Sequence, residues 1–114
     1  MMPEDELLQG LITDLRRGTL VLAVLSSLGQ PKYGYSLLQD METRGIRIEA
    51  NTLYPLLRRL ESQGLLQSRW DTAESRPRKY YMLSDRGLTL YSLLRGEWRQ
   101  MAREMEYLLG KEEL

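Results

Sequence analysis

The sequence predicts a mainly α-helical chain with a small β-hairpin and a long C-terminal helix. Three observations support this fold class. Apolar residues recur at helical spacing in several segments, glycine and proline separate those segments, and two short strand-like runs flank a polar loop. The 114 residues are enough for one compact domain, although a chain this short often completes its apolar burial in an oligomer.

Three short helices are expected in the first half of the chain. They follow an acidic segment at residues 4–12 that is itself compatible with a helix. Each of the three has apolar residues at helical spacing, and a glycine one or two residues beyond its end stops it. The expected helices are Thr19–Leu28, Gly34–Thr43 and Asn51–Gln63.

A hairpin and one long helix are expected in the second half. Leu65–Trp70 and Lys79–Leu83 resemble strands, and the polar segment Asp71–Arg78 forms the loop between them. Ser84 is a good N-cap for a helix that continues to about Leu109.

Three short helices followed by a hairpin are the layout of a winged helix-turn-helix, in which the hairpin is called the wing. The long helix is an addition to that layout. We therefore expect two units, which are a winged helix-turn-helix with an N-terminal extension at residues 1–83 and a C-terminal dimerisation helix at residues 84–114.

The composition excludes several function classes. The chain has no His and no Cys, so a zinc finger, a disulfide framework, a thiol nucleophile and an imidazole base are all excluded. The carboxylates Glu97, Glu104 and Glu106 fall at exposed-helix spacing, so neither an enzyme nor a cofactor is expected. No signal peptide or membrane-length apolar run is apparent, which favours a cytoplasmic protein without a membrane partner.

The third expected helix has two contrasting faces. Apolar residues at i, i+3, i+4 and i+7 define a core face. The opposite face carries guanidinium and amide groups, which contact phosphates and base edges in a major groove, but an ordinary solvated surface helix also shows such groups to water. The core face comprises Leu53, Leu56, Leu57 and Leu60; Asn51, Pro55, Arg58 and Ser62 lie opposite, with Tyr54 and Arg59 on the flanks.

The net charge of zero conceals a polarised distribution. Residues 44–79 hold 8 basic and 4 acidic side chains, whereas the flanking regions are acidic. The excess falls on the third helix and on Arg76, Arg78 and Lys79 at the tip of the wing. A basic wing beside a basic helix indicates a surface that follows a phosphate backbone. The alternative is a solvated hairpin whose charges discourage edge pairing.

Several segments together resemble the PadR family of bacterial transcriptional regulators. The strongest are NTLYPLLRRLE at 51–61 and RPRKYY at 76–81, supported by Gly64-Leu65, Leu83-Ser84 and Gly87. Upstream, LRRGTL at 15–20 and Tyr33-Gly-Tyr35 fit the same pattern, so the resemblance covers residues 15–90 closely. Ser75 departs from it, because a glycine often stands at this position of the wing turn.

The resemblance implies a homodimeric, DNA-binding repressor located at the nucleoid. The third helix would enter the major groove of an operator, and the wing would approach the flanking backbone or minor groove. At least one of Tyr80 and Tyr81 should be a structural strand residue. A winged-helix module that binds protein instead of DNA is the alternative. The implied DNA contacts are Lys32, Tyr33, Tyr35, Asn51, Thr52, Tyr54, Pro55, Arg58, Arg59, Arg76, Arg78 and Lys79.

The long C-terminal helix carries an apolar seam at alternating spacings of three and four residues. The seam is too short for a stable isolated coiled coil, so we expect it to pack also on the first helix of a partner subunit in a two-fold dimer. Trp98 is either a dimer-core residue or, as the resemblance implies, part of an interfacial pocket for a planar aromatic effector. The seam comprises Tyr91, Leu94, Trp98, Met101, Met105 and Leu108, and the pocket would use Leu94, Trp98, Met101 and Met105.

Overall fold

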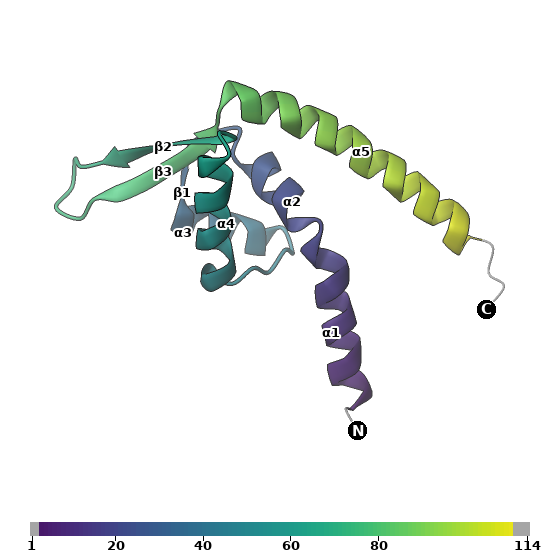
Figure 1. Cartoon of the computed structure of the whole chain (residues 1–114). Coiled ribbons are helices and arrows are strands. Elements are labelled where there is room, and N and C mark those ends of the chain that lie inside the picture. The colour runs from purple at the N-terminus through teal and green to yellow at the C-terminus, as the bar shows by residue number, and fades with distance from the viewer. Residues whose placement is uncertain (1–2, 111–114) are drawn as a thin grey trace.

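The computed structural model describes residues 3–110, which form a small helical body with a protruding hairpin and two projecting helices (Figure 1). The mainly helical fold class with a small antiparallel sheet is confirmed. The first two and last four residues of the two expected units lie outside the described residues. The elements are α1 (Glu4–Arg17), α2 (Leu20–Ser27), β1 (Lys32–Tyr33), α3 (Gly34–Thr43), α4 (Ala50–Ser62), β2 (Leu66–Asp71), β3 (Arg78–Leu83) and α5 (Asp85–Leu109).

Two elements differ from the sequence-based expectation. Helix α1 continues to Arg17 instead of ending near residue 12, and Gly10 lies inside it as exposed helix backbone. Strand β1 was not expected. It has only two residues, Lys32 and Tyr33, which is too short for an alternating pattern to be visible.

The three strands form an antiparallel sheet in the order β1-β3-β2. Tyr33 pairs with Tyr80, and Ser68 pairs with Tyr81 from the other side of β3. The last pair before the wing loop is Asp71 with Arg78. The short β1 therefore ties the start of α3 to the middle strand of the wing.

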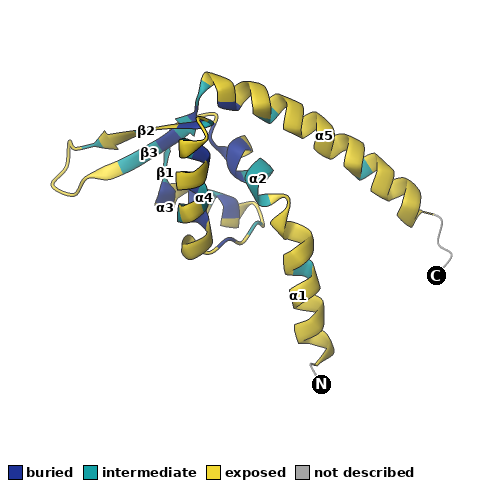
Figure 2. Cartoon of the chain, viewed as in Figure 1, coloured by how far each residue is buried: buried dark blue, intermediate teal, exposed yellow. Residues whose placement is uncertain are grey.

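The core lies where α2, α3, α4 and the base of the hairpin meet (Figure 2). The predicted core face of the third helix is confirmed, since Leu53, Leu57 and Leu60 are buried and Leu56 is partly buried. Tyr81 is 5% exposed and belongs to the same core, as expected for one of the two motif tyrosines. Burial of these apolar residues fixes which face of α4 points outward.

A tight joint holds the start of α5 to the end of α4. The predicted cap is confirmed, because Ser84 Oγ accepts the Gly87 N–H at 2.9 Å and donates to the Gly64 carbonyl at 2.6 Å. The Ser84 N–H donates to the Leu65 carbonyl at 3.0 Å. A Cβ on Gly87 would lie 2.0 Å from that carbonyl oxygen, so only glycine fits. The direction of α5 is thereby set relative to α4.

Helices α1 and α5 project from the body and expose apolar side chains (Figures 1 and 2). The radius of gyration is 17.0 Å, against about 13 Å for a compact chain of this length. None of the helices in residues 3–110 has the length and hydropathy of a membrane span. The exposed apolar residues include Leu7, Leu8, Leu11 and Leu15 of α1 and, on the seam of α5, Leu94, Trp98, Met101, Met105 and Leu108.

Candidate nucleic-acid interface

The outward face of α4 carries five of the twelve expected DNA-contacting residues. Asn51, Thr52, Pro55, Arg58 and Arg59 are all exposed on this helix. Among the described residues, neither arginine has an ion-pair partner, so both guanidinium groups are available to a ligand. Such groups bond phosphate oxygens or base edges when a helix enters a major groove.

Tyr54 is placed differently from its neighbours on α4. It is half-buried, and its ring lies over the start of α3, where a Cβ on Gly34 would be 2.5 Å from its Cε1. The tyrosine thus packs α4 against α3, and Gly34 makes room for it. Sequence periodicity placed Tyr54 on a flank of the helix, which the structure resolves as a packing contact.

Two residues at the start of α3 also differ in exposure. The ammonium group of Lys32 donates to the Ser27 carbonyl at 2.8 Å and pairs with Asp40 at 3.3 Å. This lysine therefore ties α2 to α3 with its charge already compensated. Tyr35 is 66% exposed and accepts a hydrogen bond from Gln39, so its ring is open to solvent beside α4.

Tyr33 belongs to a cluster on the outer face of the hairpin. Its ring stacks on that of Tyr80 with centroids 4.2 Å apart. Its hydroxyl is hydrogen-bonded to the Tyr80 hydroxyl at 2.7 Å and donates to Asp71 Oδ2 at 2.8 Å. The hydrogen bonds with Tyr80 and with Asp71 raise the pKa of Tyr33, while those from the Ala73 N–H and from Tyr33 lower the pKa of Asp71.

Glu61 forms a second cluster on the inner face of the hairpin. Its carboxylate accepts a hydrogen bond from Ser68 on β2 and pairs with the Lys79 ammonium on β3 at 3.2 Å. The hydrogen bonds from Ser68 and Lys79 lower the pKa of Glu61 despite its partial burial. The Lys79 ammonium also lies 5.3 Å from the Tyr81 ring and 5.9 Å from the Trp70 ring. Sequence reasoning did not single out Glu61.

The three basic residues of the wing therefore have different environments. Lys79 is paired with Glu61, and Arg78 pairs with Glu74 at 3.3 Å while its guanidinium lies 5.0 Å above the Tyr33 ring. Arg76, in the exposed loop, has no ion-pair partner within residues 3–110. Of the three, Arg76 is the cation that the hairpin leaves uncompensated.

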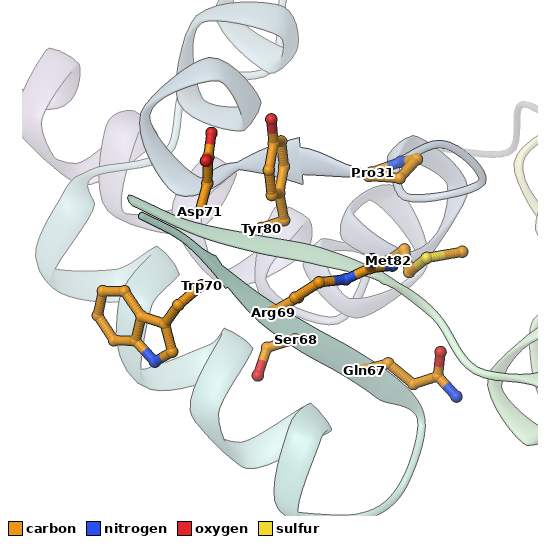
Figure 3. Close-up of a pocket in the computed structure, with 8 residues that line it drawn as sticks. All are labelled: Pro31, Gln67, Ser68, Arg69, Trp70, Asp71, Tyr80 and Met82. Carbon is orange, nitrogen blue, oxygen red and sulfur yellow. The ribbon is translucent and has the colours of Figure 1, made fainter. Parts of the chain in front are cut away.

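The outer face of the hairpin carries an open hollow of about 550 Å³ (Figure 3). Asp71 and Tyr80 project on this side, whereas Trp70 projects from the opposite face toward α4 (Figure 3). The charged lining residues Arg69 and Asp71 have opposite signs, so the hollow does not select for a charged ligand of either sign. In the described part of the chain, no three acidic side chains are grouped to hold a metal ion.

The seam of α5 lies away from the wing. Tyr91 packs partly against the core, and Arg95 lies 5.3 Å above its ring. The later seam residues are exposed by 39% at Leu94 and 46% at Trp98, and further at the methionines. A single chain therefore leaves most of this apolar stripe uncovered.

Comparisons with known proteins find one matching family and several similar proteins. The family described as the PadR-like family of transcriptional regulators matches residues 21–92. A PadR family transcriptional regulator from Eggerthella lenta DSM 2243 has a crystal structure similar to this chain, with 48% identity, a TM-score of 0.89 and 96% of each chain covered. A PadR-like transcription factor of Bacteroides fragilis is 27% identical, with a TM-score of 0.72 over 87% of this chain and 98% of its own. Transcriptional regulator Rv3488 of Mycobacterium tuberculosis is 34% identical over 73 residues, which cover 64% of this chain and 68% of that protein.

Proposed function

Because the chain belongs to the PadR-like family of transcriptional regulators, we propose that it binds operator DNA through α4 and the wing. It is a transcriptional regulator and not an enzyme. One observation supports the DNA-binding proposal above others. Arg58 and Arg59 on α4 and Arg76 on the wing are exposed and uncompensated by any carboxylate of the described residues. All three lie in the basic segment 44–79, where a polyanion is attracted most strongly.

The contacts divide by chemistry. Helix α4 enters the major groove, where Arg58 and Asn51 reach base edges and Thr52, Pro55 and Arg59 approach the adjacent backbone. Tyr35 and the wing residues Arg76 and Arg78 contact phosphates beside the groove. Tyr54, Lys32, Tyr33 and Lys79 support this surface from behind, because their polar or aromatic groups are engaged within the protein.

The functional unit is a homodimer in which one part of each chain binds DNA and another part forms the dimer. We assign residues 1–83 to the DNA-binding unit and residues 84–114, which contain α5, to the dimerisation unit. The seam of α5 packs on its two-fold mate and on α1 of the partner, which covers the exposed leucines of both helices. The α4 helices of the two subunits then meet half-sites about 34 Å apart, which is one turn of the duplex.

Regulation is proposed to act through the dimer seam. Leu94, Trp98, Met101 and Met105 would line a pocket between subunits for a planar aromatic effector, with the methionines as adaptable walls. Such an effector releases a repressor only if it binds one spacing of the recognition helices more tightly than the other. The place of action is the bacterial nucleoid, in the cytoplasm.

A footprint on the DNA upstream of the chain's own gene tests the proposal. We expect the wild-type protein to protect a symmetric site with half-sites one helical turn apart, and Arg58→Ala to lose that protection at the same concentration. Absence of protection at low salt would favour a module that binds protein instead. Protection without sequence preference would contradict the specific reading by α4.

A further inference from the structure

Two side chains of the helix-turn-helix hold the hairpin, one on each face: Glu61 forms the inner grip and Tyr33 forms the outer grip. Glu61 lies three residues after Arg58 in α4, so the helix segment proposed to read bases also touches the wing. Tyr33 immediately precedes α3 and touches the wing from the outer side. Each residue contacts both long strands. Glu61 and Tyr33 thus contact five side chains of the wing between them, which are Ser68, Asp71, Arg78, Lys79 and Tyr80.

The inner grip compensates a charge that would otherwise face DNA. Glu61 bonds Ser68 on β2 and Lys79 on β3, and the side chains of Glu61 and Lys79 are 31% and 28% exposed. A half-buried pair is screened less by salt than a surface pair. Because the Glu61 carboxylate compensates its charge, the Lys79 ammonium attracts a phosphate less than an unpaired ammonium would.

The outer grip contacts the hairpin at the last strand pair before the wing loop. Asp71 and Arg78 form the last strand pair before the loop, and the Tyr33 hydroxyl bonds Asp71 while its ring lies beneath the Arg78 guanidinium. Tyr80, stacked on Tyr33, projects from the same face as Asp71 (Figure 3). The loop that carries Arg76 therefore leaves the sheet beside strand residues that Tyr33 contacts on the outer face and Glu61 contacts on the inner face.

We propose that Tyr33 and Glu61 are positioning residues that hold the wing at a set angle to α4, so that Arg76 meets the DNA backbone while Arg58 reads the groove. The inference rests on the proposed DNA binding. It removes Tyr33 and Lys79 from the direct contacts and gives Glu61 a role in affinity, although its negative charge alone would repel DNA. Holding the wing in place before binding lowers the ordering cost of the complex.

The sign of one substitution separates this role from a direct contact. If Lys79 contacted phosphate, Glu61→Gln would release the lysine and tighten binding. If Glu61 positions the wing, the same substitution loosens the hairpin and weakens binding. Glu42→Gln is the matched control, because it removes the same charge from α3, outside the wing, where Glu42 forms an exposed pair with Arg47.

The experiment is a double-mutant cycle with the duplex protected in the footprint. We expect Glu61→Gln and Tyr33→Phe each to raise Kd about three- to tenfold relative to Glu42→Gln, the loss of one or two hydrogen bonds. In the Arg76→Ala background both effects should shrink markedly, because Arg78 is then the one remaining wing contact to position. Tyr33→Phe keeps the ring stack, which protects the fold.

Hydrogen exchange without DNA gives a second readout. We expect faster amide exchange at residues 78–80 of Glu61→Gln and Tyr33→Phe and unchanged exchange at residues 53–60 of α4. Equal or tighter binding by Glu61→Gln than by Glu42→Gln, or losses that add fully to that of Arg76→Ala, would overturn the inference. If the wild-type protein binds no DNA, the proposed function fails, and unchanged exchange at residues 78–80 would separately refute the grip.

Discussion

Arg58 and Arg76 are both exposed arginines, but their surroundings assign them different tasks. Arg58 projects from a helix whose opposite face is locked in the core, so its reach is limited to a narrow arc. Arg76 lies in the loop of a hairpin, where a side chain can follow a phosphate but has no fixed approach to a base edge. A rigid base contact gives sequence selectivity, whereas a loop contact gives affinity for any duplex.

We expect Arg58→Ala to weaken operator binding by about 1–3 kcal/mol and to relax selectivity at one base pair. Arg76→Ala should weaken binding to operator and random duplexes alike and reduce the slope of log K against log salt by about 1. Fluorescence anisotropy at several salt concentrations measures both. Arg99→Ala, which removes the same charge from the exposed surface of α5, should change neither, and equal effects of all three would contradict the assignment.

Glu61 links stability to pH. Its pKa is lowered by the hydrogen bonds from Ser68 and Lys79, so its contribution is fully present above the ordinary glutamate value of 4.5 and is lost as pH falls through the lowered value. We expect urea unfolding to show wild type more stable than Glu61→Gln at pH 7. The difference should shrink towards pH 3, because a protonated glutamate resembles glutamine. A difference that is constant from pH 7 to pH 3 would contradict the ionic contribution.

At the scale of elements, the joint between α4 and α5 connects the proposed DNA-recognition helix to the proposed dimer seam. Ser84 bonds the backbone at Gly64 and Leu65, and the missing side chain of Gly87 allows the first turn of α5 to touch that backbone. Because these contacts fix the start of α5 to the residues that follow α4, we expect a change in the direction of α5 to be felt at the end of α4. If the proposed interfacial effector binds, this joint would transmit its effect to the proposed operator contacts of α4.

Two glycines of α5 test the joint. Gly87→Ala places a Cβ against the Leu65 carbonyl, and we expect a loss of about 2–3 kcal/mol in the free energy of unfolding. Gly96→Ala, in the same helix but with nothing within 4 Å, should instead gain about 0.5–1 kcal/mol from reduced backbone entropy. Denaturant unfolding at equal protein concentration measures both. Similar changes in the two variants would contradict a close approach at Gly87.

At the scale of the whole molecule, one chain leaves the apolar faces of α1 and α5 exposed to solvent. No residue of α1 is buried, and the seam of α5 is exposed along most of its length. The two projecting helices also account for the extended shape. An apolar stripe of this size marks an association site in a chain that otherwise has an ordinary core.

We expect Leu94→Glu combined with Met101→Glu to give monomers, because two carboxylates would face their symmetry mates across the seam. Operator affinity should fall steeply, since each monomer meets a single half-site. Sedimentation equilibrium gives the mass. Ser92→Glu with Arg99→Glu, at the same seven-residue spacing but off the seam, should remain dimeric; a dimer formed by the seam variant would exclude the proposed interface.

Trp98 reports on the proposed effector site. In a Trp70→Phe background Trp98 is the remaining tryptophan of the chain, and we expect its fluorescence to be quenched saturably by the neutral planar compound acridine. Adding Leu94→Glu and Met101→Glu should abolish saturation, because the pocket needs two subunits. Identical titrations in dimer and monomer would show that acridine binds a single helix surface instead.

Local sequence determined the core and all the elements except the two-residue strand β1 and the end of α1. The leucine spacing of α4, the serine cap of α5 and the glycine stops are properties of neighbouring residues, because helix periodicity and capping act within one or two turns. The same periodicity correctly placed Leu53, Leu57 and Leu60 inside and Arg58 outside. The RPRKYY segment indicated the family because a sequence motif, too, is read from consecutive residues.

Tertiary structure decided which polar side chains are available. Tyr33 meets Asp71 across 38 positions of sequence, and Lys79 meets Glu61 across 18, so neither pairing has a local pattern that could announce it. Sequence alone treated Lys32, Tyr33 and Lys79 as free surface groups. Only the folded chain shows them engaged, because a charge is neutralised by whatever lies within a few ångströms in space, however distant it is along the chain.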